Sequence, residues 1–514
     1  MALWVIEADG KVKRFQEILK KAGIQGAEVF ATGGHLFSAP RSLHPLGIDR
    51  NYQDVRNPVR PDRVEKLTSL AGLADHLIVA TDPDDEGDVI AADVARLVQK
   101  IRPDLPISRI RLQALSPAAL TSALERKGPV GEGVAGTVRR VFDRWIGGTF
   151  SRSQGVPVGR VFSAFLSVVS ATPLPLGRVV IRYPAVDGPP FFATVPLLAG
   201  KKDEWSARIR AFDSLLPVSP ATVELRPRPA PFSFGDALLD LRRNAGMSVV
   251  EGARRIQSLY ERGVLSYPRT DSRGLSRESA EDLLSLAKKA GLTGFDPARL
   301  PSLDPLSPHE ALHPLGEAIR ISDRGDQTVV ERISRRALHA GLPPYPVEIP
   351  AADSLPEWAR SIGLFRPLHR LGPDREPMAS AGIAMDAPDA IVLQGLMAAG
   401  LGRPSTLPSH VEKILAQHVL DSEGCLTAKG RVYRDKTPGA ISDPGLTATM
   451  EGILKAMGQN GEGVKKTMEA LLKTLPGEIR EQMETALADP LSSPETEIER
   501  NHVPSGIGIE WGPR

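Results

Sequence analysis

The chain has 514 residues, enough for about three or four domains of ordinary size. Its 64 Lys and Arg residues nearly balance 62 Asp and Glu residues, and the formal net charge of +2 argues against a polybasic tail or an acidic disordered segment. The single cysteine, Cys425, excludes an internal disulfide framework and zinc sites built on several thiolates. No apolar run is long enough for a signal peptide or a membrane span, so we expect a soluble cytoplasmic protein.

Residues 1–130 show an alternating α/β pattern. Short apolar runs at residues 3–8 and 77–80 predict strands, and helical patterns follow at residues 11–22 and 86–100. Strands that alternate with helices are typical of a parallel sheet. We therefore predict a first domain with a Rossmann-like parallel sheet.

Proline-rich stretches divide the rest of the chain, because proline lacks a donor N–H and restricts the residue before it. The patterns between them predict four further units. These are a discontinuous helical domain at 131–172 and 391–490, a discontinuous β-rich arch at 173–230 and 346–390 with a strand at 178–183, a helical domain at 231–345, and a tail at 491–514. Within the second helical segment, residues 465–472 and 477–488 are the last predicted helices.

Five carboxylates follow the predicted strand at residues 77–80, in the segment TDPDDEGD at 81–88. Such a charge needs a hard cation, and Asp82 and Asp84 face the same side of an extended segment. A solvated acidic turn and a cap for the next helix remain alternatives, whereas the spacing disfavours a calcium loop. Glu7 ends the first strand, and since parallel strands share their carboxyl edge, it is expected beside these acids.

A tyrosine motif follows an amphipathic helix that is predicted at residues 248–263, with Ser248 and Glu251 as a capping box. Pro268 biases Tyr267 towards an extended conformation. A phenol titrates near 10, so Tyr267 needs a neighbouring cation or base to act as a nucleophile, and Arg269 is the natural partner. Packing inside the protein is the competing role for Tyr267, and it is the expected role of Tyr260.

The nearly neutral total charge conceals two arginine-rich stretches. Residues 226–277 contain ten arginines and five acids, and residues 139–160 contain five arginines and one acid, for net charges of +5 and +4. These stretches are candidate phosphate-binding patches.

The order of the motifs resembles that of one enzyme family. Eight motifs follow one another along the chain. They are the opening V-I-E with Lys11 and Lys13, GHL at 34–36, TDPDDEGD at 81–88, RRVFDRWIG at 139–147, GRVFS at 159–163, the tyrosine motif at 256–272, HEALHP at 309–314 and LGRPST at 401–406. In this order of motifs the chain resembles the type IA DNA topoisomerases, and the resemblance extends from about residue 3 to residue 455.

Three positions depart from the family pattern. Asp85 stands where the acidic motif usually has arginine, Phe162 where G-R-V-Q-S has glutamine, and His313 where H-E-A-I-R-P has arginine. Each change removes a contact to phosphate or DNA, and the extra carboxylate of Asp85 is expected to steepen the Mg²⁺ requirement. The lone cysteine also means that the zinc-ribbon tail of many relatives is absent.

The resemblance implies a toprim domain and a toroid with a central hole. It also implies that Tyr267 attacks a backbone phosphorus to form a 5'-phosphotyrosyl link, so that strand passage and religation need no ATP. The chain indeed contains no G-x-x-x-x-G-K-[ST] loop. The enzyme would be a monomer that acts on single-stranded or negatively supercoiled DNA and yields relaxed or decatenated DNA. It would be cytoplasmic, and associated with the nucleoid if the host is a bacterium.

The resemblance also assigns roles to residues. Arg269 and Lys11 would stabilise the phosphate, Glu7 would act as general acid and base, and His309 would contact the scissile region. The family's Mg²⁺ site would comprise Glu7, Asp82, Asp84 and Glu86. The DNA-binding residues would be Arg139, Arg140, Asp143, Arg144, Arg160, Ser163, Arg403, Ser405 and Thr406.

Two alternatives stay open at this point. A toprim-type primase or Mg²⁺-dependent nuclease would share Glu7 and the acidic cluster but would have no use for Tyr267. A catalytically degenerate DNA-binding relative is the other, because Asp85, Phe162 and His313 depart from the family pattern.

Overall fold

The computed structural model describes residues 1–304, 307, 309–316, 319–368 and 382–488. No helix within these residues combines the length and the apolar character that crossing a membrane requires. The predicted tail at 491–514 and part of the predicted β-rich segment at 346–390 lie outside the described residues.

The first domain contains a four-stranded parallel sheet in the order β2-β1-β5-β6, which confirms the predicted α/β architecture. Successive β1 residues face opposite sides of the sheet: Leu3 and Val5 belong to one apolar cluster, and Trp4 and Ile6 to another. The strands are β1 (Ala2–Ile6), β2 (Ala27–Ala31), β5 (His76–Val79) and β6 (Ile107–Arg109), and the helices are α1 (Val12–Lys21), α2 (Pro61–Gly72), α3 (Asp85–Ile101) and α4 (Pro117–Glu125). A short pair, β3 (Phe37–Ser38) and β4 (Asn57–Pro58), lies beside them.

A helical region is assembled from two distant parts of the chain. Helices α5 (Val134–Gln154) and α6 (Arg160–Ala171) contact α16 to α19, and the buried indole of Trp145 donates a hydrogen bond to the Met483 carbonyl at 2.7 Å. The predicted helices at 465–472 and 477–488 are present as α18 (Val464–Leu472) and α19 (Gly477–Ala488). The remaining helices are α13 (Pro388–Ala398), α14 (Leu407–Ala416), α15 (Ala428–Lys436), α16 (Gly439–Ser442) and α17 (Pro444–Gln459).

Two small antiparallel sheets form the β-rich part, and the predicted strand at 178–183 lies within β7 (Pro175–Tyr183). A helix, α7 (Lys202–Arg210), interrupts the stretch at 173–230 that we predicted to be β-rich. Its first turn is acidic and its last turn basic, which favours a helix through the helix dipole. The other elements are β8 (Phe191–Leu198), β12 (Gly382–Met385), β9 (Pro220–Arg226), β10 (Tyr345–Pro350), β11 (Arg366–Pro367) and α12 (Glu357–Arg360).

The segment with Tyr267 follows α9 (Val249–Glu261), which begins and ends close to the prediction. The Ser248 hydroxyl accepts a hydrogen bond from the backbone N–H of Glu251 at 3.1 Å. The Glu251 side chain bonds to Arg255 at 2.9 Å, so its expected role in the capping box is taken by this ion pair. The neighbouring helices are α8 (Phe234–Ala245), α10 (Arg277–Lys289) and α11 (Arg324–Ala340).

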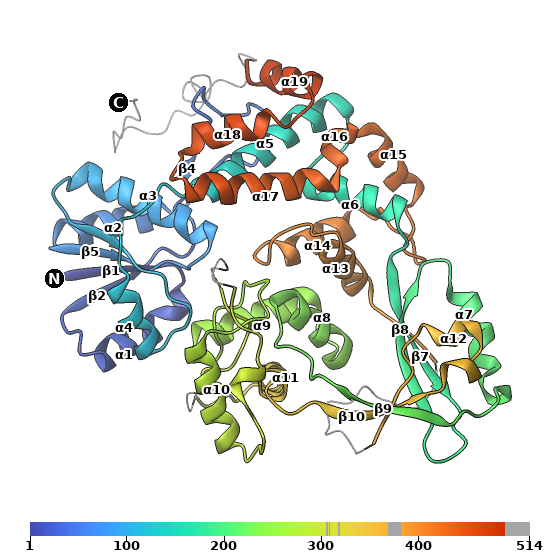
Figure 1. Ribbon diagram of the computed structural model, residues 1–514. Coiled ribbons are helices and arrows are strands. Elements are labelled where there is room, and N and C mark those ends of the chain that lie inside the picture. Colours follow the sequence, from blue (N-terminus) through green and yellow to red (C-terminus); the bar gives the residue numbers. More distant parts are fainter. Residues whose placement is uncertain (305–306, 308, 317–318, 369–381, 489–514) are drawn as a thin grey trace.

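The elements follow one another around a ring, in agreement with the expected toroid (Figure 1). The parallel sheet lies on the left, α5 and α17 to α19 at the top, β7 and β8 on the right, and α8 to α11 at the bottom. Helices α13 and α14 lie inside this ring, where they contact α6, α8 and α9.

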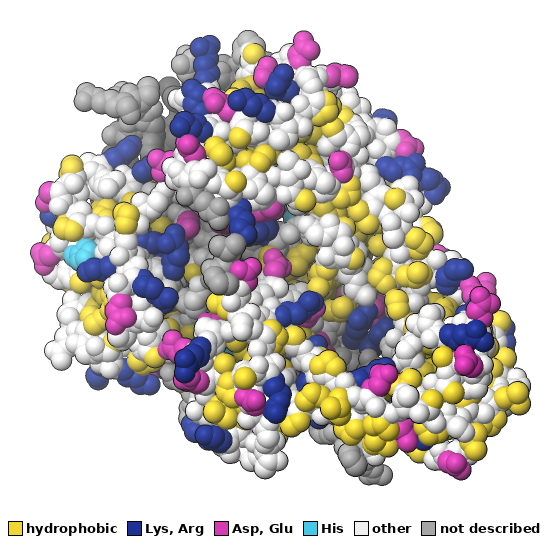
Figure 2. Space-filling view, viewed as in Figure 1, with side chains coloured by type: hydrophobic (Ala, Val, Ile, Leu, Met, Phe, Trp, Pro, Cys, Tyr) yellow, Lys and Arg dark blue, Asp and Glu magenta, His cyan; other side chains and the backbone are white. Residues whose placement is uncertain are grey.

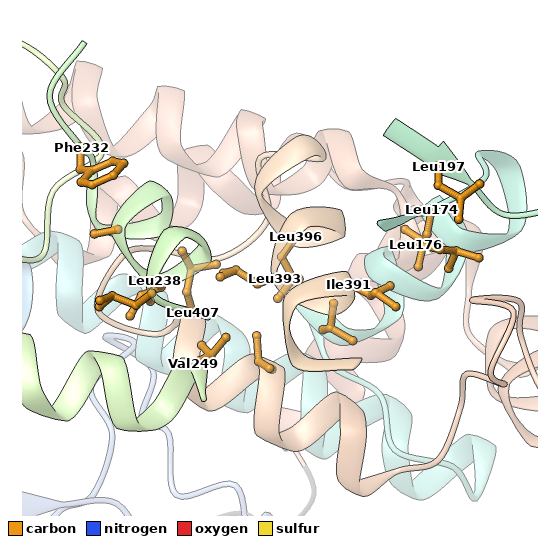
Figure 3. Packing of buried hydrophobic residues seen from close by; sticks show 14 of the residues in the cluster. Leu174, Leu176, Leu197, Phe232, Leu238, Val249, Ile391, Leu393, Leu396 and Leu407 are labelled. Atoms are coloured by element: carbon orange, nitrogen blue, oxygen red, sulfur yellow. The ribbon is translucent and has the colours of Figure 1, made fainter. Parts of the chain in front are cut away.

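Helix α13 joins these parts through buried apolar side chains (Figure 3). It packs against β7 on one side and against α8 and α9 on the other. Since these contacts are apolar and continuous, the segment that carries the tyrosine is held against the helical region by the hydrophobic effect. The contributing residues include Leu174, Leu176, Leu197, Leu238, Val249, Ile391, Leu393, Leu396 and Leu407.

The start of α3 gives a first test, because Gly87 packs against the backbone of the acidic segment. A Cβ at Gly87 would lie 2.0 Å from the carbonyl oxygen of Asp82, so we expect Gly87→Ala to lower the free energy of unfolding by about 2 kcal/mol or more. Gly72→Ala is the matched control, since a Cβ at that helical position meets nothing within 4 Å and should change stability by less than about 1 kcal/mol. Urea unfolding followed by circular dichroism measures both, and equal effects would contradict the close approach.

Candidate active site

The acidic edge of the parallel sheet meets the tyrosine segment. Strands β1 and β5 are direct neighbours, so Glu7 and Asp82, which follow them, come together at the carboxyl edge as expected. Between the two segments, the backbone N–H of Tyr267 donates at 2.9 Å to the carbonyl of Gln113, which lies four residues after the end of β6. Residues that are more than 180 positions apart in the sequence therefore share one site.

Tyr267 is almost fully buried, with 2% of its surface exposed, and its hydroxyl donates a hydrogen bond to Oδ2 of Asp84 at 2.7 Å. Nη1 of Arg269 donates to the same oxygen at 3.2 Å. The other Asp84 oxygen caps α3 by accepting from the Gly87 N–H at 2.8 Å. Asp84 is thus held in place by three donors, and Arg269 reaches the tyrosine through this carboxylate.

The protonation states follow from this arrangement. Burial, with the negative charge of Asp84 as the second cause, raises the pKa of Tyr267 far above its usual range, so the resting phenol is neutral. Burial also pushes the pKa of Asp84 up, but Arg269 and the hydrogen bonds outweigh it and lower that pKa. The closed site therefore holds a protonated nucleophile hydrogen-bonded to an ionised carboxylate. Asp84 is thus placed where a proton acceptor for Tyr267 would be needed.

A second group of charges lies directly beneath the tyrosine. The Lys11 ammonium forms a buried ion pair with Asp82 and lies 4.6 Å from the ring centroid of Tyr260. Tyr260 packs edge-on against Tyr267 at 5.4 Å, which is the packing role that we expected for it. Burial, with Asp82 as the second cause, raises the pKa of Glu7 to about 7. Glu7 can therefore hold or release a proton near neutral pH.

His309 completes the wall around the tyrosine. Its ring lies 4.8 Å from the Tyr267 ring, and its Nδ1 is 3.1 Å from Oε1 of Gln113. With the amide oxygen as acceptor, Nδ1 carries the proton, and burial lowers the pKa of His309, so the ring is neutral. Gln113 carries no motif that sequence reasoning could have used, yet it contacts both Tyr267 and His309.

The four acids expected at a metal do not form a ready-made ligand cluster. No group of three or more His, Cys, Asp or Glu side chains in the described parts of the chain has the spacing of a metal site. Asp84 bonds to Arg269 and Tyr267, and Glu86 bonds to Nε2 of His35 at 2.7 Å. Two buried oxygens, Oε2 of Glu7 and Oδ2 of Asp82, have no hydrogen-bond partner among the described residues. This pair fits Mg²⁺, which takes one or two carboxylates and keeps several waters.

A cavity of about 750 Å³ opens beside the tyrosine, between the sheet edge and the helical region. Arg139 in its wall binds Asp85 and also Glu451, and Arg403 bonds to Glu451 at 3.2 Å and lies 3.5 Å from Asp85. Asp85 is thus paired with arginines of the helical region, and the steeper Mg²⁺ requirement expected from this carboxylate stays a prediction. Sequence reasoning had no signal for Glu451, which lies more than 300 residues from Arg139.

The other expected DNA-binding residues divide into two groups. Arg140 bonds to Asp54 at 2.8 Å, and Arg160 bonds to Asp143 at 2.8 Å, and both arginines line the cavity. Arg144 instead donates to carbonyls of the segment 40–46, and Ser163 is fully buried, so neither is brought to the cavity. Asp143, Arg403, Ser405 and Thr406 line the cavity as well.

The second arginine-rich stretch is neutralised in the same way. Arg242 bonds to Asp389, Arg243 to Asp386 and Arg273 to Asp236. Figure 2 accordingly shows basic and acidic side chains mixed over this face. Acids from within this stretch and from the segment at 386–389 thus pair with these arginines.

Comparisons with known proteins match both halves of the site. A family model described as the Toprim domain matches residues 2–115, and one described as DNA topoisomerase matches residues 217–352. The chain is 24% identical over 318 residues to DNA topoisomerase 1 of Aquifex aeolicus, a match that covers 56% of each chain. It is 30% identical over 243 residues to reverse gyrase 2 of Aeropyrum pernix, which covers 45% of this chain and 20% of that relative.

The fold is also similar to that of a solved structure. Full-length topoisomerase I from Thermotoga maritima matches with a TM-score of 0.65 and 20% identity, over 92% of this chain and 89% of that chain. Against the two sequence relatives, in contrast, the chain spans about a fifth and about half of their length.

The raised pKa of Glu7 predicts a pH-dependent stability. Between the ordinary pKa of 4.5 and the folded pKa of about 7, the folded chain binds more protons than the unfolded chain, so stability falls as the pH rises through this range. Glu7→Gln removes this loss, and in metal-free buffer its stability relative to wild type should improve by up to about 3 kcal/mol between pH 4.5 and pH 8.

Urea unfolding at several pH values measures this difference. Glu28→Gln is the control, because Glu28 is exposed on β2, and it should follow the wild-type curve at every pH. Parallel curves for Glu7→Gln and wild type would contradict the desolvated state of Glu7.

Proposed function

The chain belongs to the type IA DNA topoisomerase family, and from this premise we propose that it cuts one DNA strand through Tyr267, passes a strand and reseals the cut without ATP. One observation carries the proposal: the Tyr267 hydroxyl is hydrogen-bonded to an ionised carboxylate at the toprim edge. A toprim nuclease or primase would have no use for this tyrosine, and a purely binding relative would not need to keep it beside a base.

In the cleavage step, the phosphorus exchanges its bond to the 3'-oxygen for a bond to the Tyr267 oxygen. The Tyr267 oxygen attacks the phosphorus, its proton passes to Asp84, and the bond from phosphorus to the 3'-oxygen breaks. Glu7 donates a proton to that leaving oxygen, which becomes a 3'-hydroxyl. Religation is the reverse: Glu7 takes the proton back and Asp84 returns its proton to the phenol. Because the phosphotyrosyl link retains the bond energy, no ATP is consumed.

Positive charge stabilises the phosphate as negative charge develops on its oxygens. Arg269 pairs with Asp84 beside the tyrosine, and Lys11 pairs with the neighbouring Asp82, so both cations are within the same site. His309 lies against the tyrosine ring and would position the phosphate at the wall of the cavity.

The unpartnered oxygens of Glu7 and Asp82 would hold Mg²⁺, with Asp84 and Glu86 beside them. When bound, the ion would supply positive charge that secures the DNA phosphates for rejoining. The protein's own cations balance part of the charge at this edge: Lys11 pairs with Asp82, Arg269 with Asp84 and His35 with Glu86.

Substrate entry requires the site to open, because Tyr267 and Lys11 are almost completely buried. We assign the opening to separation of residues 231–345 from the toprim domain at 1–130, with the proline-rich joints near 172, 229 and 345 as hinges. The helical parts at 131–172 and 391–490 would hold the strand, and the parts at 173–230 and 346–390 would form the arch. We further propose a monomer that acts on single-stranded or negatively supercoiled DNA in the cytoplasm.

The covalent intermediate provides the direct test. Incubated with 5'- or 3'-labelled single-stranded DNA and Mg²⁺ and stopped with detergent, the wild-type chain should carry DNA through the 5' phosphate of the cut. Tyr267→Phe should form no adduct, whereas Tyr260→Phe, the matched change on the packing tyrosine, should still form it. Cleaved DNA without any adduct would support a nuclease instead.

The pairing of Asp85 with Arg139 and Arg403 predicts competition with DNA phosphates. Asp85→Asn removes one negative charge from the cavity wall, so the two arginines keep only the Glu451 ion pairs described above and attract phosphate more strongly. We expect single-stranded DNA to bind roughly threefold to tenfold more tightly, with a salt dependence steeper by up to about 0.7 per added phosphate contact.

Fluorescence anisotropy at several salt concentrations measures the affinity. Asp104→Asn makes the same charge change at an exposed pair with Arg102, outside the cavity, and should leave the affinity unchanged. Weaker binding by Asp85→Asn would mean that Asp85 positions the arginines and does not compete with the strand.

A further inference from the structure

A second cavity, of about 510 Å³, lies on the other side of Tyr267. One wall comes from the toprim domain between β6 and α4, and the opposite wall comes from α10 and the segments around Ser266 and His313. Arg111, Gln113 and Ser307 line both this cavity and the larger one. The two cavities therefore meet at Gln113, where Tyr267 is held by its backbone hydrogen bond.

Glu310 supplies an unsatisfied acceptor in this second cavity. Its carboxylate oxygen Oε2 is buried, and no described residue donates a hydrogen bond to it. A buried carboxylate oxygen without a donor is unfavourable, so it favours a ligand that brings an N–H group. The carboxylates of Glu278 and Asp282 line the same cavity and add negative charge around it.

His313 explains why this acceptor is left free. It stands where the similar family motif has arginine, which would bring a cation next to Glu310. Here Nδ1 of His313 donates to the Ala311 carbonyl at 2.8 Å, which leaves Nε2 as an acceptor. Burial lowers the pKa of His313, so the ring is neutral and offers Glu310 no positive charge. The motif thus adds no cation next to Glu310, and the positive charge of the lining comes from Arg109, Arg111 and Arg126 of the toprim side.

The remaining walls suit a nucleotide. Small side chains of α4, including Ala118, Ala119 and Ala123, leave room for a flat ring on the toprim side. Arg111 is half exposed where the two cavities meet, pairs with Asp88 at 2.8 Å, and can turn to a phosphate. A strand whose scissile phosphate lies at Tyr267 would place a neighbouring nucleotide beside this opening.

We propose that the second cavity is a subsite for a base of the cleaved strand, close to the cut, and that Glu310 selects bases with an exocyclic amino group. Adenine, cytosine and guanine can donate such an N–H to a carboxylate, and thymine cannot. The inference deepens the proposed function and rests on it, because the base is brought there by the strand that Tyr267 cuts.

Oligonucleotides that differ by one amino group test the subsite. Labelled single strands carry adenine or purine, and in a second set cytosine or uracil, at each position within four nucleotides of a cleavage site. The measured quantity is the ratio of covalent adduct within each pair. At one position, wild type should prefer the amino-bearing base roughly tenfold.

Two variants then remove the acceptor by different means. Glu310→Ala deletes the carboxylate, and His313→Arg restores the residue of the family motif, which neutralises Glu310 and fills part of the cavity. Both should reduce the preference at that position to less than about twofold. Glu281→Gln is the control, because it changes a carboxylate of α10 that does not line the cavity, and it should keep the wild-type ratio.

The outcomes distinguish failure of the subsite from failure of the proposed function. Adduct with an unchanged ratio in Glu310→Ala and His313→Arg overturns the subsite and leaves the proposed function standing. A ratio near one at every position in wild type also overturns the subsite. Absence of any adduct in wild type overturns the proposed function, and the subsite with it.

Discussion

The hydrogen bond between the Tyr267 hydroxyl and Asp84 is the contact on which the rest of the site depends. It crosses from the tyrosine segment to the toprim edge, and the same carboxylate oxygen holds Arg269. The bond buries the phenol, keeps it protonated and places it against its base. One contact therefore closes the site and aligns the phenol with a carboxylate. The two pKa shifts keep the proton on the phenol in the closed state, and substrate cannot reach the tyrosine until the two segments part.

Charge balance inside the molecule follows the same logic. The net charge of +2 does not reflect a lack of strong local charge, since acids and bases are paired across distant segments. Lys11 balances Asp82, Arg269 balances Asp84, and Arg139 joins Asp85 to Glu451. In this closed arrangement the chain's own cations and anions occupy the positions at which phosphates and a metal ion would be expected.

The sequence predicted the parallel sheet, the helix before the tyrosine and the meeting of Glu7 with Asp82, because each depends on a local pattern or on the shared carboxyl edge of parallel strands. It did not predict the partners of Arg139 or the contacts of Gln113, since these join residues about 200 to 300 positions apart without any motif. The helix α7 was missed as well, because the surrounding segment is rich in β-branched residues, which favour strands. Only its charged ends favour a helix.

Opening changes the electrostatics of both sides at once. When the tyrosine segment moves away, Arg269 leaves Asp84, and Tyr267 loses the carboxylate whose charge raises its pKa. The toprim edge is left with Asp82 and Asp84 against Lys11, an excess of negative charge that favours a cation. On the other side, Arg269 is released with its charge unpaired next to the tyrosine, where a phosphate joined to that tyrosine would meet it. The separation that exposes the site therefore also creates complementary charges on its two halves, and the contacts that end at opening are those that the covalently held strand can replace.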